Sequence, residues 1–421
     1  MAEMQSISVR DCRWPSIIAR LSAVADLDAT AREFGAFQRA RKVRDAEDLL
    51  RLIFLYGPAH LSLRSTAAAA AEAGLASLSD KGVLGRLRKA GDWLEHLLEC
   101  LLRDKQGLSA APAAGGLRLS LVDGSVICVP GSEGTDWRLH ARFDPGRGSF
   151  ADLVLSRGTV SERVDRTAIT AGQTTIQDRG YARVRDFHAV LAARAHFITR
   201  IGWRSLRLLN AERQPIDVLG LLPPDDRPVD HTVWLKGMAV PLRVVIQRIP
   251  PEKAAQQRKR VARKASKAGH RIDPRTAVAA GYLMLITSLS AAQSAVEVLA
   301  EYRGRWQIEV AFKRIKSIAG IDRLPALDPG LARTWLLAHL IAAVLTDEIA
   351  IEIVGFPPRP TDTAKRQMSL WRAWQAAHRF LLHAILPRPR RRTRRNLAQL
   401  RQHLSEPPRN RISQANRLRT G

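Results

Sequence analysis

The sequence changes its periodicity once near residue 110, and this change most limits the folds open to the chain. Residues 27–105 carry apolar side chains at helical spacing, and an N-cap signal stands at Ser79. A segment rich in Gly, Ala and Pro follows at 106–116, which we interpret as a linker. After it, short apolar runs alternate with turn residues, a pattern typical of strands. We therefore expect a helical domain followed by a sheet.

The sheet part of the sequence is interrupted by a segment of different character. Strands are expected at 117–122, 126–129, 138–143, 150–155, 173–177 and 196–201, with a helix at 181–195. Residues 202–280 then hold short strands and a strongly basic helix at 251–270. An apolar strand at 281–287 and a long helix at 290–318 restore the earlier pattern, and further helices are expected at 329–354 and 364–386. The sequence predicts a mixed α/β sheet with a β-rich insertion.

The chain is strongly basic for a globular protein. It has 67 Lys and Arg against 40 Asp and Glu, a formal net charge of +27, although its 46% hydrophobic residues are ordinary. Most of the bases are arginines, which make forked contacts to phosphate. Such a charge indicates a polyanionic partner, most often nucleic acid. The helices around Gly74 fit either a helix-turn-helix or a plain bundle, and nearby bases slightly favour DNA contact.

Cysteines and apolar stretches argue against other classes. Cys12, Cys100 and Cys128 stand far apart and form no metal-binding pair motif. The first residues lack the apolar core of a signal peptide. The longest apolar stretch, 335–345, is about half a membrane span. We expect a reduced, cytoplasmic, nucleoid-associated protein without membrane contact.

One helical segment, 301–316, gathers charged side chains on a single face. At about 100° per residue, an arc of about 80° holds Tyr302, Arg305, Glu309, Lys313 and Lys316. One carboxylate thus lies among three cations and a phenol. An ordinary solvated face, with Glu309 paired to Arg305 or Lys313, explains the same pattern. The segment alone leaves both interpretations open.

Two aspartates stand where strands are expected to end. Asp123 follows the run at 117–122, and Asp178 follows the run at 173–177. Carboxylates at strand ends of an open α/β sheet converge on the crevice that binds ligands. With Glu309 they would make the oxygen set that two Mg²⁺ ions need for in-line phosphoryl transfer. A turn or helix-cap role would explain each aspartate on its own.

The charged helix resembles the signature of a known family. Its spacing, Tyr302-x2-Arg305-x3-Glu309-x6-Lys316, is similar to the YREK signature of the DDE transposases of bacterial insertion sequences, specifically the fourth insertion-sequence family.

The two aspartates extend this resemblance. Asp123-Gly-Ser is similar to the family's first acidic motif, in which Thr often replaces Ser, and Asp178-Arg-Gly-Tyr is similar to the second. The long gap before Glu309 matches the family's β-rich insertion. The likeness covers about residues 30–350.

The resemblance implies a fold and a set of domains. The fold is an RNase H-like mixed sheet with a β-rich insertion, preceded by an N-terminal helical domain and followed by C-terminal helices. The expected parts are a helical DNA-binding domain at 1–105, a catalytic domain at 117–201 and 281–320, the insertion with its basic helix at 202–280, and C-terminal helices with a basic tail at 329–421.

The resemblance also implies roles for single residues. Asp123, Asp178 and Glu309 would bind two Mg²⁺ ions, with Mn²⁺ as a substitute. DNA phosphates near the cut end would be held by Tyr302, Arg305 and Lys316, and less specifically by Lys313 and Arg179. Trp306 would stack on a base or simply pack.

The implied activity is cut-and-paste transposition. Water would attack the phosphodiester at a transposon end, and the freed 3′-OH would attack target DNA. The partners would be double-stranded DNA, both transposon ends and target, and a second copy of the chain to pair two ends. The sequence contains no Gly-rich phosphate loop, so no nucleotide cofactor is expected.

Alternative functions explain fewer of these features. An RNase H-like nuclease would cleave without joining strands, and a DNA-binding protein derived from a transposase would do neither. A basic RNA-binding protein accounts for the charge but not for the acids. A recombinase with Tyr302 as nucleophile would need an Arg/His cluster of different spacing. The basic run at 388–395 predicts that deleting 387–421 weakens binding to all DNA sequences alike.

Overall fold

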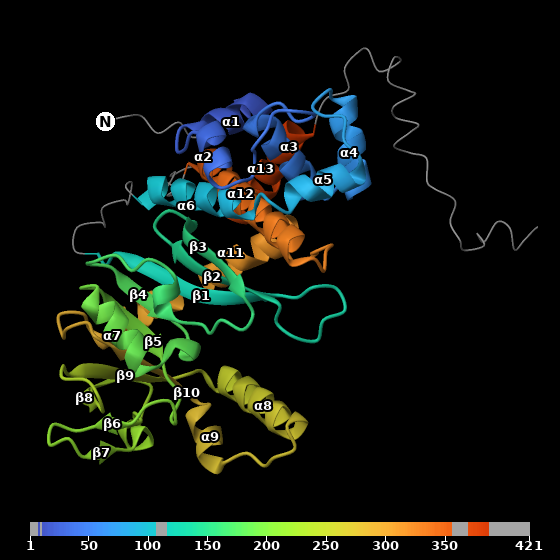
Figure 1. Ribbon diagram of the computed structural model, residues 1–421. Helices are drawn as coiled ribbons and strands as arrows, with labels where there is room; N and C mark the ends of the chain where they lie inside the picture. Colours follow the sequence, from blue (N-terminus) through green and yellow to red (C-terminus); the bar gives the residue numbers. More distant parts are fainter. Residues whose placement is uncertain (1–6, 9–10, 107–115, 356–368, 387–421) are drawn as a thin grey trace, which may run out of the picture. The chain divides into compact units, whose positions relative to one another are not determined.

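A computed structural model describes residues 7–8, 11–106, 116–355 and 369–386 (Figure 1). The chain forms two compact units. The helical unit comprises residues 1–107, 129–131 and 315–421, and the sheet unit comprises residues 108–128 and 132–314. Most of the expected linker and all of the basic tail lie outside the described residues. The division into four parts remains a prediction.

The helical unit is built around one long helix. Its helices are α1 (Trp14–Ser22), α2 (Leu27–Glu33), α3 (Ala46–Tyr56), α4 (Leu63–Glu72), α5 (Asp80–Leu87), α6 (Gly91–Gln106), α12 (Pro329–Val354) and α13 (Leu370–Ile385). Helices α3, α5, α6 and α13 pack against α12. Because α12 is apolar on all sides, nearly every residue from Leu331 to Ala350 is buried.

Helix boundaries in this unit follow their caps. The Ser79 side chain accepts a hydrogen bond from the backbone of Gly82 and starts α5, as the sequence predicts. Asp328 caps α12 in the same way, and Gly355 ends it in a left-handed conformation with φ 62°. Helix α1 was not expected from the sequence. No helix in the described ranges has both the length and the apolar character needed to span a membrane.

The sheet unit contains a mixed sheet of ten strands (Figure 1). They are β1 (Leu119–Ile127), β2 (Trp137–Asp144), β3 (Ser149–Arg157), β4 (Thr174–Gln177), β5 (His196–Arg200), β6 (Leu208–Leu209), β7 (Pro215–Ile216), β8 (Val229–Leu235), β9 (Leu242–Arg248) and β10 (Tyr282–Thr287). Their order is β3-β2-β1-β4-β5-β10-β9-β8-β6-β7. Pairs β1–β4 and β4–β5 are parallel, and the others are antiparallel. The predicted mixed α/β architecture is confirmed.

The described part of this unit also contains five α-helices. They are α7 (Val184–Ala192), α8 (Pro251–Lys267), α9 (Pro274–Ala279), α10 (Ala295–Arg303) and α11 (Trp306–Lys313). Helix α7 packs on β5, where the rings of Phe187 and Phe197 stack with centroids 4.4 Å apart. The basic helix α8 lies between β9 and β10 in the chain, as expected for the insertion (Figure 1).

Two expectations about local structure are wrong. Asp123 does not end a strand, because β1 continues through it and pairs with β2 as far as Ile127. The long helix expected at 290–318 starts later and is divided into α10 and α11 at Gly304, a residue with low helix propensity. There the backbone N–H groups of Gly304 and Arg305 bond to carbonyls three residues back, as in a 3₁₀ turn.

Candidate active site

The register of two neighbouring strands places the aspartates beside each other in the sheet. Val122 of β1 pairs with Gln177 of β4, so the residue that follows each of them is an aspartate. Parallel pairing ends at this point, and Asp178 begins a short 3₁₀ turn by accepting a hydrogen bond of 2.7 Å from the backbone of Gly180. Asp123 accepts a similar bond of 2.8 Å from Gly124. Local backbone donors thus orient both carboxylates.

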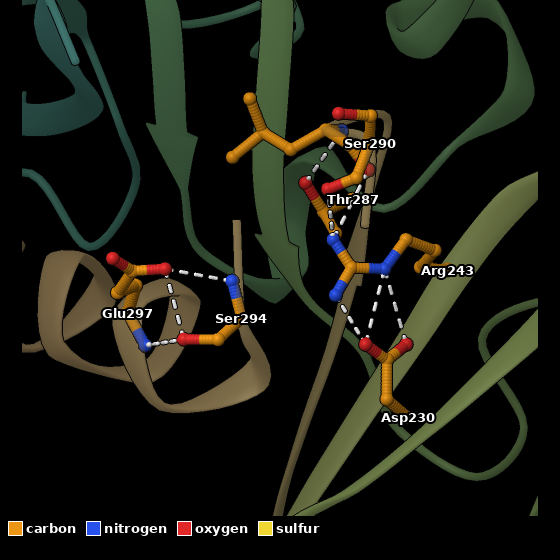
Figure 2. Close-up of polar contacts among 7 residues, drawn as sticks. Asp230, Arg243, Thr287, Ser290, Ser294 and Glu297 are labelled. Carbon is orange, nitrogen blue, oxygen red and sulfur yellow. Dashed lines mark hydrogen bonds and ion pairs between the residues drawn. The ribbon is translucent and has the colours of Figure 1, made fainter. Parts of the chain in front are cut away.

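A buried arginine contacts the segment that precedes α10 (Figure 2). Arg243 of β9 pairs with Asp230 of β8 and donates to the carbonyls of Leu289 and Ser290. The chain then turns into α10, whose start is a capping box between Ser294 and Glu297. These contacts fix the segment before α10 and so set where α10 and α11 begin.

Helix α11 carries Glu309 and packs against β1. Its Ile308 and Phe312 are buried, and the ring centroid of Phe312 lies 6.1 Å from that of Phe150 on β3. Glu309 lies outside this apolar face, with half of its side chain exposed. The helix therefore packs through one face while it presents the glutamate to the site.

Arg305 connects the first and third acids. Its guanidinium lies 3.4 Å from the Asp123 carboxylate and forms an ion pair with Glu309. The ordinary helix pair that the sequence allowed is therefore present, but it also reaches Asp123 on β1. A cavity of about 400 Å³ lies here, and its lining includes Asp178, Tyr302, Arg305 and Glu309.

Burial changes the protonation behaviour of these groups. Desolvation raises the pKa of Asp123 to about 6, against the lowering effects of the Gly124 N–H and Arg305. Desolvation also raises the pKa of Tyr302 to about 12, so its phenol stays protonated at neutral pH, which disfavours a nucleophilic role. Burial alone would lower the pKa of Arg305, but Tyr302, Glu309 and Asp123 together raise it.

Of the remaining residues predicted to bind DNA, one lines the cavity and the others lie outside its lining. Arg179 lines the cavity with the acids. Trp306 is 59% exposed, so it is not part of the core, and its role stays a prediction. Lys313 is exposed on α11. Lys316 belongs to the helical unit, in the π-helical turn Arg314–Ile318, so its role stays a prediction.

Sequence reasoning missed several residues near the acids. Glu162 forms an ion pair of 2.8 Å with Arg138 and lies against Gly124, where a Cβ atom would come within 2.8 Å of the Glu162 carboxylate. This glutamate follows no expected strand, so spacing offers no signal for it. Arg200 and two bases of α8 also line the cavity. The strongly basic helix was visible in the sequence, but its place beside the acids depends on contacts between distant segments.

The acids have the chemistry of a site for hard cations. Carboxylate oxygens are the ligands that Mg²⁺ and Mn²⁺ prefer, and Asp123 is a desolvated carboxylate that a cation would stabilise. Within the described ranges, no three His, Cys, Asp or Glu side chains are grouped closely enough to hold a metal ion. The Arg305 guanidinium lies between Asp123 and Glu309 and offsets their repulsion. The donor types fit, and the ligand set remains a prediction.

Comparison with known proteins identifies the family. The family model described as "Transposase DDE domain" matches residues 114–345, more than half of the chain. The chain therefore belongs to the DDE transposases and is an enzyme that acts on DNA. It is 38% identical over 364 residues to the putative transposase InsL for insertion sequence element IS186A of Escherichia coli (strain K12), covering 84% of this chain and 98% of the relative. The resemblance to insertion-sequence transposases is confirmed.

Two further proteins are similar to the chain. The transposase for insertion sequence element IS421 of Escherichia coli is 38% identical over 365 residues, with the same coverage of 84% and 98%. The solved piggyBac transposase synaptic complex with hairpin DNA aligns over 94% of this chain and 85% of that chain, with 10% identity and a TM-score of 0.44. That score is too low to define a shared fold.

Proposed function

We propose that this transposase cuts DNA at transposon ends and joins the freed 3′-OH to target DNA, with Asp123, Asp178 and Glu309 as ligands of two divalent metal ions. The observation that carries the proposal is the arrangement around Arg305. Arg305 pairs with Asp123 on β1 and Glu309 on α11, and it lines the same cavity as Asp178, which follows the neighbouring strand β4. A double-metal site takes its carboxylates from separate elements in this way.

The chain's own groups have distinct tasks in this proposal. Bound Mg²⁺ or Mn²⁺ would supply Lewis-acid stabilisation for displacement at phosphorus. Tyr302, which keeps its proton, can donate to a phosphate oxygen, and Arg179 can neutralise phosphate charge in the same cavity. Arg305 neutralises Asp123 and Glu309 before substrate binds, and it can then pair with a phosphate. The exposed Trp306 can stack on a base, and Lys313 and Lys316 would add phosphate contacts.

The same proposal extends to fold and assembly. Strands β3-β2-β1-β4-β5, in that order and with β2 and β3 antiparallel to their neighbours, support an RNase H-like core. Joining two transposon ends to one target requires two copies of the active site. We therefore propose a homodimer on double-stranded DNA, with the chain acting at both transposon ends.

The test is a cleavage and joining assay with Glu309→Gln. Purified protein is mixed with labelled duplex DNA from the two ends of the element that encodes it, in Mg²⁺ or Mn²⁺. Removing one ligand of a metal clamp worth several kcal/mol should lower the rate of cleavage about 10³-fold or more. Binding to the end DNA without divalent metal should stay close to that of the unchanged protein.

Glu133→Gln is the matched control, because Glu133 is an exposed glutamate of the same unit that lies in a loop. It should cleave and join normally. Normal cleavage by Glu309→Gln would overturn the assignment of the third acid. Cleavage without joined product in the unchanged protein would replace transposition by nuclease activity.

A further inference from the structure

The cavity beside the acids has a second, cationic wall. Besides Asp178 and Glu309, its lining includes Arg200 on β5 and Arg260 and Lys264 on α8. Sites that only need to hold metal ions do not require cations on the opposite side. A substrate with several negative charges favours them, because each phosphate that a Lys or Arg neutralises releases counterions and strengthens binding.

Helix α8 has two faces with different tasks. Ala254 and Ala265 are buried, and the nearby Arg258 donates a bond of 3.2 Å to the carbonyl of Ala277, so this side packs against its own unit. At about 100° per residue, the basic face formed by Lys253, Arg260, Lys264 and Lys267 lies within an arc of about 60° on another side. Gln257 and Val261, at the border between the two faces, line the cavity.

The cations of this wall have no ion-pair partner among the residues that the structure describes. Across the part of the chain that the structure describes, Arg200, Arg260 and Lys264 form no ion pair with a carboxylate, and Arg260 and Lys264 are exposed. Uncompensated cations that converge on one cavity are expected to repel one another. An external polyanion would relieve that repulsion.

The length of the basic face fits a stretch of nucleic acid. From Lys253 to Lys267 the helix rises about 21 Å, at about 1.5 Å per residue. This equals about six nucleotide steps at about 3.4 Å each. Arg260 and Lys264, in the middle of this face, line the cavity, and the face extends beyond them in both directions along the exposed helix. A single small anion would use only the middle of such a surface.

We propose that this basic face of α8 binds the DNA backbone next to the bond that is cut. Arg260 and Lys264 contact the phosphates nearest the acids, and Lys253 and Lys267 contact phosphates farther along the same strand. The contacts are independent of base sequence. This inference rests on the proposed function only for the position of the cut, and it assigns to α8 a binding task separate from the metal chemistry.

The test compares two double variants of the same helix. Arg260→Gln with Lys264→Gln removes two charges from the basic face. Lys259→Gln with Arg263→Gln removes the same charges, at the same spacing, from a side turned about 70–110° away from the middle of that face. Binding to duplex DNA from the element's ends is measured against salt concentration without divalent metal. Unchanged melting temperatures show that each variant is folded.

The first pair should weaken binding and lower the slope of log K against log salt by about 1.8, which is about 0.9 for each lost phosphate contact. The control pair should change both much less. Hydroxyl-radical footprints should lose protection in the first variant only at nucleotides beside the cut. Equal effects from both pairs, or protection lost evenly along the duplex, would overturn the proposal.

The outcome is separable from that of the metal site. Glu309→Gln should bind with an unchanged salt slope while cleavage is lost, and the first α8 variant should bind weakly while cleaving once DNA is saturating. Cleavage by Glu309→Gln would refute the metal assignment and leave the α8 binding result standing. A normal salt slope in the first α8 variant would refute the α8 inference alone.

Discussion

Arginine has different surroundings in the two units of this chain. In the helical unit Arg20, which is only 2% exposed, contacts both Glu348 and Asp104, and the partly buried Arg333 contacts Asp92 and Glu95. Each of these two arginines is matched by two carboxylates of the same unit. Such pairs tie helices together, because breaking them would leave a charge without a partner.

The basic side chains that line the cavity of the sheet unit are not paired in this way. Within the described residues, Arg179, Arg200, Arg260 and Lys264 line the cavity without a carboxylate partner. The comparison shows that a net charge of +27 does not by itself indicate which bases bind DNA. The bases that lack an internal partner and share a cavity with the acids are those available to phosphate.

The largest effect is expected when a paired arginine of the helical unit is replaced. Arg20→Met should lower the free energy of unfolding by about 3–5 kcal/mol, because Glu348 and Asp104 lose their main partner in a buried setting. Chemical denaturation of the purified protein measures this. Arg260→Gln, from the unpaired group, should leave the denaturation midpoint unchanged. Similar losses in both variants would remove the distinction between structural and ligand-binding arginines.

An intermediate effect is expected for an exposed tryptophan. Trp306 on α11 is 59% exposed, whereas Trp335 on α12 is 1% exposed. Trp306→Ala should leave thermal stability unchanged and weaken binding to end DNA by about 1–3 kcal/mol if it stacks on a base. Fluorescence anisotropy with labelled DNA gives the affinity. Unchanged affinity would mean that Trp306 does not contact DNA.

A third effect is absent at neutral pH and develops only in acid. Burial lowers the pKa of His339 to about 3 and that of His378 to about 4, both in the helical unit. The unfolded chain therefore binds protons more readily below its pKa of about 6.5, so this stabilisation is complete above about pH 6.5 and is lost as pH falls through the folded values. The slope is about 1.4 kcal/mol per pH unit for each group.

His339→Gln should therefore flatten the dependence of unfolding free energy on pH between 6.5 and 4, measured by denaturation at several pH values. His339 contacts His60, with ring nitrogens 3.4 Å apart, and the backbone carbonyl of Trp335. An unchanged slope in the variant would show that His339 is protonated in the folded protein.

Local patterns predicted most secondary structure correctly. The Ser79 cap, the strands now called β4 and β5, and the basic helix α8 all follow from side chains close together in sequence. Such signals are local, so they do not depend on where the element lies in the fold. The same is true of the motif around Tyr302, Arg305 and Glu309, which lines one cavity although the helix is broken at Gly304.

Features that depend on distant segments could not be predicted in this way. Asp123 lies inside β1 because β2 pairs along the whole strand, and nothing local indicates that pairing. The contact between Arg305 and Asp123 joins residues 182 positions apart. Helix α8 and the acids also lie far apart in the sequence, so no local pattern indicates that they line the same cavity.

The register between β1 and β4 limits where the gene can accept insertions and deletions. Side chains alternate between the two faces of a strand, so removing one residue from Leu119–Val122 or Thr174–Gln177 would move an aspartate by one position and turn it to the opposite face. The turn at 145–148, between β2 and β3, lies outside this pairing. Insertions and deletions should therefore accumulate in such turns among functional copies of the element, while both short strands keep their length.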